Sequence, residues 1–160
     1  HKLGAPDNAE LAIGAVAEDG TLVVDVDPLT RWWLTPHYLD DEVARQKTEL
    51  ARRAVLYRGG RERAPLIDRL AVVIDDGVAT GYTLIAAVRS IRAARAARII
   101  AAVPVGSAEA IARLRREADR VVCLAAPDMF WAVSQYYDSF PQVSDDQVIA
   151  ALADGPPPQT

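Results

Sequence analysis

The sequence is poor in the residues on which several classes of protein depend. Cys123 is the one cysteine, and only two of the 160 residues are histidine. One cysteine excludes an internal disulfide and is typical of a reducing cytoplasm. No group of histidines, cysteines and carboxylates has the spacing of a zinc site. Because Cys123 lies in an apolar run, we predict that it is a small buried hydrophobic residue.

Long apolar runs, massed basic residues and two familiar catalytic motifs are also missing. No run is long enough to span a membrane, and no signal peptide is visible. The sequence has neither a Walker lysine nor a Gly-x-Ser-x-Gly elbow. Its 18 Lys and Arg residues are scattered, and the net charge is -4 at pH 7. We therefore expect a cytoplasmic protein that binds neither a membrane nor nucleic acid.

Apolar strand patterns and helical patterns alternate over the second half of the chain. Strands are predicted at 70–75, 98–103 and 120–125, with helices between them, the first over 83–95. Alternation at this spacing predicts an α/β protein with a parallel sheet and right-handed crossovers. Residues 71–74 have no polar side, so we predict that this strand is buried on both faces.

The two ends of the chain carry simpler signals. Apolar runs at 11–16 and 22–24 flank an Asp-Gly pair, which predicts a hairpin. Thr35-Pro36 predicts the start of a helix that runs to about Tyr57 and ends at two glycines. Ser107 is predicted to cap the helix after strand 98–103, and Ser144 and Gln147 form a predicted capping box for a last helix. We assign residues 1–154 to one domain and residues 155–160 to a disordered tail.

The most specific pattern is AVVIDDGVATGYT, from Ala71 to Thr83. An apolar strand ends in Asp75 and Asp76, and a turn of small and hydroxyl residues then leads into a helix. Gly77 and Gly81 allow a sharp turn, and amides at a helix N-terminus bind anions. Two carboxylates beside a phosphate cradle suit a ligand that carries a phosphate and a vicinal diol or a metal. An ordinary turn with an acidic cap would leave the paired aspartates unexplained.

This stretch resembles the phosphoribosyl pyrophosphate (PRPP) loop of the type I phosphoribosyltransferases: four apolar, two acidic and seven small or hydroxyl residues. The resemblance implies a three-layer α/β fold, with a mainly parallel sheet flanked by helices and a hairpin near the N-terminus. It implies that Asp75 and Asp76 bind the ribose hydroxyls and, directly or through water, Mg²⁺ as the cofactor. The 5′-phosphate would be bound by the loop that follows: Gly77, Val78, Ala79, Thr80, Gly81, Tyr82 and Thr83.

Three other groups have roles that the residues alone leave open. Lys2 is either the lysine that reaches the pyrophosphate in the family or a solvated terminal residue. The aromatic segment after the last strand either stacks on the base or seals the sheet against the terminal helix; it contains Phe130, Trp131, Tyr136 and Tyr137. Trp32-Trp33 is either a lid over PRPP or a contact with another subunit.

Two loop positions depart from what is usual in the family. Ala79 stands where enzymes for 6-oxopurines carry an aspartate, which argues against hypoxanthine and guanine as substrates. Tyr82 replaces a small residue, and its ring either packs over the phosphate site or points to solvent.

The resemblance implies transfer of the 5-phosphoribosyl group from PRPP to a nitrogenous base, with release of pyrophosphate. The alternatives are a regulatory module that senses PRPP or a nucleotide, and a non-catalytic partner domain; a homo-oligomer is compatible with each. The first core strand of the family and its pyrophosphate-binding turn have no counterpart here. We therefore expect one edge of strand 70–75 to lie open, and a marginally stable or self-associating chain.

Overall fold

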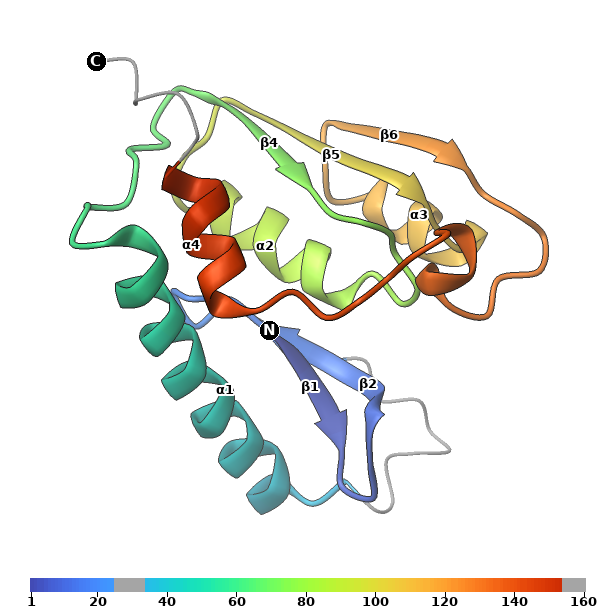
Figure 1. The fold of residues 1–160 in the computed structure, drawn as a ribbon, viewed down its shortest axis with the longest axis horizontal. Coiled ribbons are helices and arrows are strands. Elements are labelled where there is room, and N and C mark those ends of the chain that lie inside the picture. The colour runs from blue at the N-terminus through green and yellow to red at the C-terminus, as the bar shows by residue number, and fades with distance from the viewer. Residues whose placement is uncertain (25–33, 154–160) are drawn as a thin grey trace.

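Two three-stranded sheets form the framework of the computed structural model, which describes residues 1–24 and 34–153 (Figure 1). The antiparallel sheet has the order β1-β2-β3 and the parallel sheet the order β4-β5-β6. The strands are β1 (Lys2–Ala5), β2 (Asn8–Val16), β3 (Leu22–Val24), β4 (Leu70–Ile74), β5 (Arg98–Val105) and β6 (Arg120–Ala125). The predicted α/β class, parallel sheet and N-terminal hairpin are confirmed. Strand β1 was not predicted, because it is short and shows no alternation of apolar and polar residues.

Three helices begin where the sequence places a cap, at Thr35, Ser107 and Ser144. The helices are α1 (Pro36–Arg58), α2 (Tyr82–Ala93), α3 (Ala108–Leu114), the 3-10 helix η1 (Val133–Tyr136) and α4 (Asp145–Ala153). The Tyr38 amide donates to the Thr35 hydroxyl at 3.2 Å. The capping box is formed, with Ser144 N donating to Gln147 Oε1 at 2.9 Å. These local signals were read correctly because each cap depends on residues only three positions apart.

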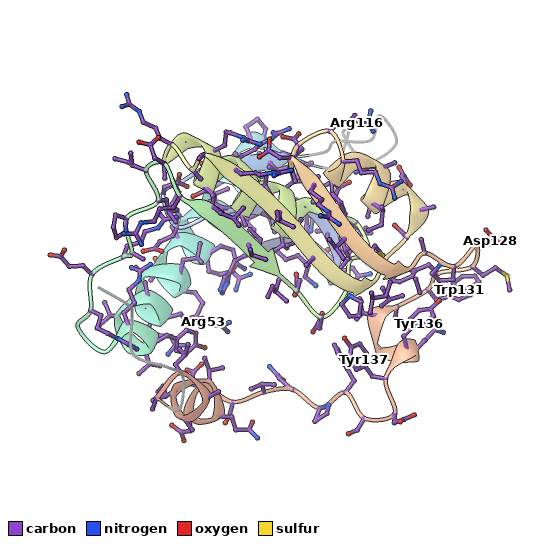
Figure 2. All side chains as sticks on the ribbon, turned by 90° about the horizontal axis from the view of Figure 1, so that it is seen from above. Arg53, Arg116, Asp128, Trp131, Tyr136 and Tyr137 are labelled. Carbon is purple, nitrogen blue, oxygen red and sulfur yellow. The ribbon has the colours of Figure 1, made fainter. Side chains whose placement is uncertain are left out.

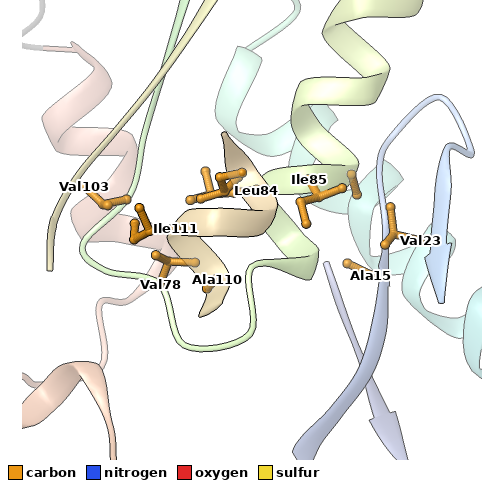
Figure 3. Close-up of a cluster of buried hydrophobic side chains, with 10 residues drawn as sticks. Ala15, Val23, Val78, Leu84, Ile85, Val103, Ala110 and Ile111 are labelled. Atoms are coloured by element: carbon orange, nitrogen blue, oxygen red, sulfur yellow. The ribbon is translucent and has the colours of Figure 1, made fainter. Parts of the chain in front are cut away.

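Helix α2 lies between the two sheets and joins them through one apolar cluster (Figure 3). Strands β2 and β3 contribute Ala15 and Val23 to this cluster, and α2 contributes Leu84 and Ile85. The cluster also contains Val78, which belongs to the loop after β4. Burying such a side chain stabilises the fold by roughly 1.5–3 kcal/mol, so the core itself holds this loop in place.

Helix α1 packs on the other side of the antiparallel sheet and also contacts α4. The carboxylate of Glu42, only 6% exposed, accepts hydrogen bonds from Arg45, Gln46 and the Gly4 amide. Burial alone would raise the pKa of Glu42, but these hydrogen bonds lower it. At the other end of α1, Asp145 of α4 accepts hydrogen bonds from Tyr57 at 2.6 Å and Arg52 at 2.9 Å.

One face of the parallel sheet is apolar and exposed, so the prediction that strand 71–74 is buried on both faces is wrong. Val72 is 52% exposed and Ile74 76%, whereas Ala71 is 8% exposed. Leu124 on β6 is 81% exposed and continues the same surface. An apolar run shows that burial of both faces of a strand is favourable. It does not show whether the chain supplies a cover for each face.

Strands β4 and β6 form the two edges of the parallel sheet. Strand β4 pairs with β5 alone among the described residues, so its other edge is open, as predicted. Cys123 lies on β6 at the opposite edge and is half-buried rather than buried, with its thiol 3.1 Å from the Ala125 carbonyl oxygen. The prediction of a buried Cys123 failed because an edge strand has a neighbour on one side only. In residues 1–24 and 34–153, no helix is long and apolar enough to cross a membrane.

Candidate functional site

The candidate site is the loop 75–83, which leaves β4 at the carboxyl end of the parallel sheet and leads directly into α2. The Asp75 amide still donates to the Ala102 carbonyl of β5, at 3.2 Å. Asp75 is therefore half-buried at the end of the sheet, whereas Asp76 is exposed. Ligands of open parallel sheets bind at this end of the strands.

Hydrogen bonds to the chain after β5 fix the middle of the loop. Val78 N donates to Val105 O at 3.0 Å, and Ser107 N donates to Val78 O at 2.9 Å. The Ser107 hydroxyl donates to Ala79 O at 2.7 Å and also accepts from the Ala110 amide at the start of α3. Sequence reasoning recognised Ser107 only as a helix cap. Its position after the neighbouring parallel strand was the signal that it also lies beside the loop.

The last part of the loop forms the start of α2. Gly81 has a φ of 85°, a left-handed conformation that favours glycine, and its carbonyl accepts the first helical hydrogen bond, from Ile85. No side chain of the described residues caps this end of α2, and Thr80 and Thr83 are exposed. The first amides of the helix and two hydroxyl groups are thus available to an anion.

The paired aspartates give the other end of the loop its electrostatics. Burial raises the pKa of Asp75, and the charge of Asp76 raises it further, while a hydrogen bond from the Asp76 amide opposes both. The ionised form of Asp75 is therefore less favoured here than in a free side chain. Hydroxyl donors or a cation would relieve this cost.

A magnesium ion would have to share its coordination with a ligand. The described residues contain no cluster of three or more His, Cys, Asp and Glu side chains that could hold a metal. Asp75 and Asp76 supply only hard oxygen donors, which Mg²⁺ prefers, and Mg²⁺ commonly takes its remaining ligands from phosphates and water. The donor set therefore fits an ion that arrives with a phosphorylated ligand.

The ring of Tyr82 lies against α3. Arg113 donates to the Tyr82 hydroxyl at 3.1 Å, and its guanidinium carbon lies 5.4 Å from the ring centroid. The side chain is partly buried in this contact. Tyr82 therefore packs between α2 and α3. This differs from both predicted orientations, over the phosphate site and towards solvent.

The aromatic segment after β6 contacts the loop, which sequence reasoning missed. The Tyr137 hydroxyl donates to the Asp76 carbonyl oxygen at 2.6 Å, and the ring of Phe130 is stacked on that of Tyr136, with centroids 5.5 Å apart. Trp131 is 79% exposed and belongs to the same segment (Figure 2). Its assignment to a base pocket stays a prediction.

Two other predicted residues have different outcomes. Lys2 lies in β1 and is partly buried, and its assignment to the pyrophosphate stays a prediction. Trp32-Trp33 lies outside the described residues.

Alanine at position 77 is expected to destabilise the protein by about 1–3 kcal/mol, the usual cost of overpacking. The added Cβ would lie 2.6 Å from Val133 Cγ1 and 3.2 Å from Val105 Cγ1. Removing the methyl groups of Val133 should therefore recover part of this loss. We expect free energies of unfolding in urea to show strong coupling between Gly77→Ala and Val133→Ala. Strictly additive costs would show that the two positions do not touch.

Comparison with known proteins places this loop in a family context. The family described as phosphoribosyl transferase domain matches residues 40–141. Two Mycobacterium tuberculosis proteins, named "Putative phosphoribosyl transferase Rv0571c" and "Putative phosphoribosyl transferase MT0597", are each 46% identical over 151 residues, 94% of this chain. The chain spans about a third of the length of these curated relatives, 34% in each case.

A solved structure agrees with this result. The crystal structure of the protein TT1426 from Thermus thermophilus is 43% identical in sequence and superimposes with a TM-score of 0.71. The match covers 95% of this chain and 72% of that one.

Proposed function

Because the chain belongs to the phosphoribosyl transferase domain family, we propose that it binds PRPP at the loop 75–83 and transfers the 5-phosphoribosyl group to a nitrogenous base. The observation that carries the proposal is the loop itself. Its middle, at Val78 and Ala79, is fixed by hydrogen bonds with Val105 and Ser107, while no side chain of the described residues caps the amides at the start of α2. A phosphate can bind there without reorganising the loop.

The two ends of the loop would bind the two parts of the sugar phosphate. Residues 77–83 would bind the 5′-phosphate through backbone amides and the hydroxyl groups of Thr80 and Thr83. The carboxylates of Asp75 and Asp76 would accept hydrogen bonds from the 2′- and 3′-hydroxyls. Charge-assisted hydrogen bonds of this kind are the strong ones, and they would fix the ribose ring in one orientation.

In the proposed reaction, the bond between ribose C1 and a pyrophosphate oxygen breaks and a bond from C1 to a base nitrogen forms. No side chain has to act as a nucleophile, so the residues of the loop contribute by positioning the ribose against the incoming base. Mg²⁺, if held by Asp75 or Asp76, would offset the negative charge of the departing pyrophosphate. Lys2 would contact the pyrophosphate as well, and Phe130 and Trp131 would contact the base.

One observation favours a second candidate function, binding without turnover. One face of the Phe130 ring is already stacked on Tyr136, and Trp131 is 79% exposed. Of the two rings predicted to contact the base, one is thus already stacked within its own segment and the other is largely exposed. Release of pyrophosphate in the presence of PRPP, Mg²⁺ and a panel of bases separates the two functions, since a sensing module binds PRPP and releases none.

We expect calorimetry to detect binding of PRPP in the presence of Mg²⁺, and weaker binding of ribose 5-phosphate. Both ligands carry the 5′-phosphate and the diol, whereas only PRPP adds the pyrophosphate contacts. Ribose, which lacks the phosphate, is the control and should not bind. The absence of heat with millimolar PRPP would contradict the assignment of the loop.

A further inference from the structure

We infer that the segment 130–140 is a clamp that holds the loop 75–83 in its binding conformation, with Tyr137 as the main positioning residue. The inference rests on the proposed function, because it concerns the same loop. The segment would thus hold the phosphate-binding loop in shape, in addition to the base contact proposed for Phe130 and Trp131. Two contacts, at neighbouring loop residues, carry the argument.

The first contact fixes the peptide between Asp76 and Gly77. The Tyr137 hydroxyl donates to the Asp76 carbonyl oxygen at 2.6 Å. A trans peptide is planar, so its N–H points away from its C=O. Holding the carbonyl oxygen of Asp76 on one side therefore directs the Gly77 amide to the other side. That amide is the first donor of the loop after the two carboxylates.

The second contact is between the clamp residue Val133 and the next loop residue, Gly77. A Cβ on Gly77 would lie 2.6 Å from Val133 Cγ1 and 2.9 Å from Val133 Cγ2. The side chain of Val133 thus leaves no room for a Cβ at position 77. The φ of Gly77 is not in the left-handed region, so close approach rather than backbone conformation accounts for glycine here.

The clamp has its own internal contacts, which fix the direction of the Tyr137 hydroxyl. The rings of Tyr137 and Phe140 lie 5.1 Å apart, and those of Phe130 and Tyr136 lie 5.5 Å apart. The 3-10 helix η1 lies between Phe130 and Tyr137 and brings Val133 and Tyr137 to the same loop. Because these contacts restrict the side chains before a ligand arrives, ordering the loop costs less when it binds.

Tyr137→Phe tests the clamp, with Tyr136→Phe as its matched control. The two tyrosines are 37% and 40% exposed, and each donates its hydroxyl to a carbonyl oxygen. The acceptor of Tyr136 is Met129, 3.1 Å away and directly before the clamp in the chain, whereas the acceptor of Tyr137 is in the loop. We expect the Kd for ribose 5-phosphate, measured by calorimetry, to rise about fivefold in Tyr137→Phe and less than twofold in Tyr136→Phe.

A second measurement needs no ligand. We expect backbone amides of residues 75–83 to exchange with deuterium several times faster in Tyr137→Phe than in wild type or Tyr136→Phe, with similar melting temperatures in all three. If wild type fails to bind ribose 5-phosphate, the proposed function is wrong and the clamp's role in binding falls with it, while the exchange rates still report whether Tyr137 orders the loop. Unchanged exchange in Tyr137→Phe overturns the clamp. Faster exchange with an unchanged Kd overturns its positioning role.

Discussion

Asp75→Asn and Asp76→Asn are each expected to weaken the binding of ribose 5-phosphate by about 10- to 100-fold. Each substitution removes a charge-assisted hydrogen bond to a ribose hydroxyl, worth about 1.5–3 kcal/mol. Asparagine keeps the shape of the side chain, so the loop should keep its conformation. Asp40→Asn is the matched control, because Asp40 is an exposed carboxylate of α1, and α1 lies apart from the loop between β4 and α2 (Figure 1). Wild-type affinity in both site variants would show that the carboxylates do not bind the ribose.

Although Asp75→Asn should weaken binding, it should leave the stability of the folded protein unchanged or raise it, and this effect should depend on pH. Burial raises the pKa of Asp75 above its unfolded value of about 3.9. Ionising this carboxyl then destabilises the folded state. The loss of stability develops as the pH rises through the raised pKa, and it is absent below the unfolded pKa. We expect Asp75→Asn to match or exceed the melting temperature of wild type at pH 7, with any gain lost near pH 3. A gain that persists at pH 3 would point to a cause other than this charge.

Self-association through the exposed face of the parallel sheet is the second large effect that we expect. Val72, Ile74 and Leu124 are 52%, 76% and 81% exposed on this face, and β4 presents an open edge beside them. Burying such side chains is favourable by roughly 1.5–3 kcal/mol each. In a solution that holds only this chain, a second copy is the one protein that can cover the face. The mass measured by light scattering should therefore rise with concentration.

Leu124→Lys should shift that equilibrium towards the monomer, because a charge on the apolar face makes its burial unfavourable. Val55→Lys is the matched control. Val55 is 75% exposed on α1, and Leu124 is 81% exposed on β6. The control should associate like wild type. A wild-type chain that stays monomeric at every concentration would show that the exposed face needs no cover.

The sequence by itself determined the elements whose causes are local. The thirteen residues 71–83 predicted a strand, a turn and a helix start, because the necessary groups follow one another along the chain. The caps at Thr35, Ser107 and Ser144 were predictable because each depends on a hydrogen bond between residues three positions apart. Strand and helix patterns in alternation predicted the parallel sheet, since short crossovers leave few other arrangements.

Only the tertiary structure decided what lies against each element. Tyr137 and Asp76 are 61 residues apart, and Ser107 and Ala79 are 28 apart, so no periodicity could pair them. Likewise, the apolar run of β4 gave no indication that its second face is exposed, because hydrophobicity records a preference for burial and not the presence of a covering layer. Contacts between distant segments depend on how the whole chain packs. For that reason, the loop's course from strand to helix was predictable, while the groups that hold the loop in shape were not.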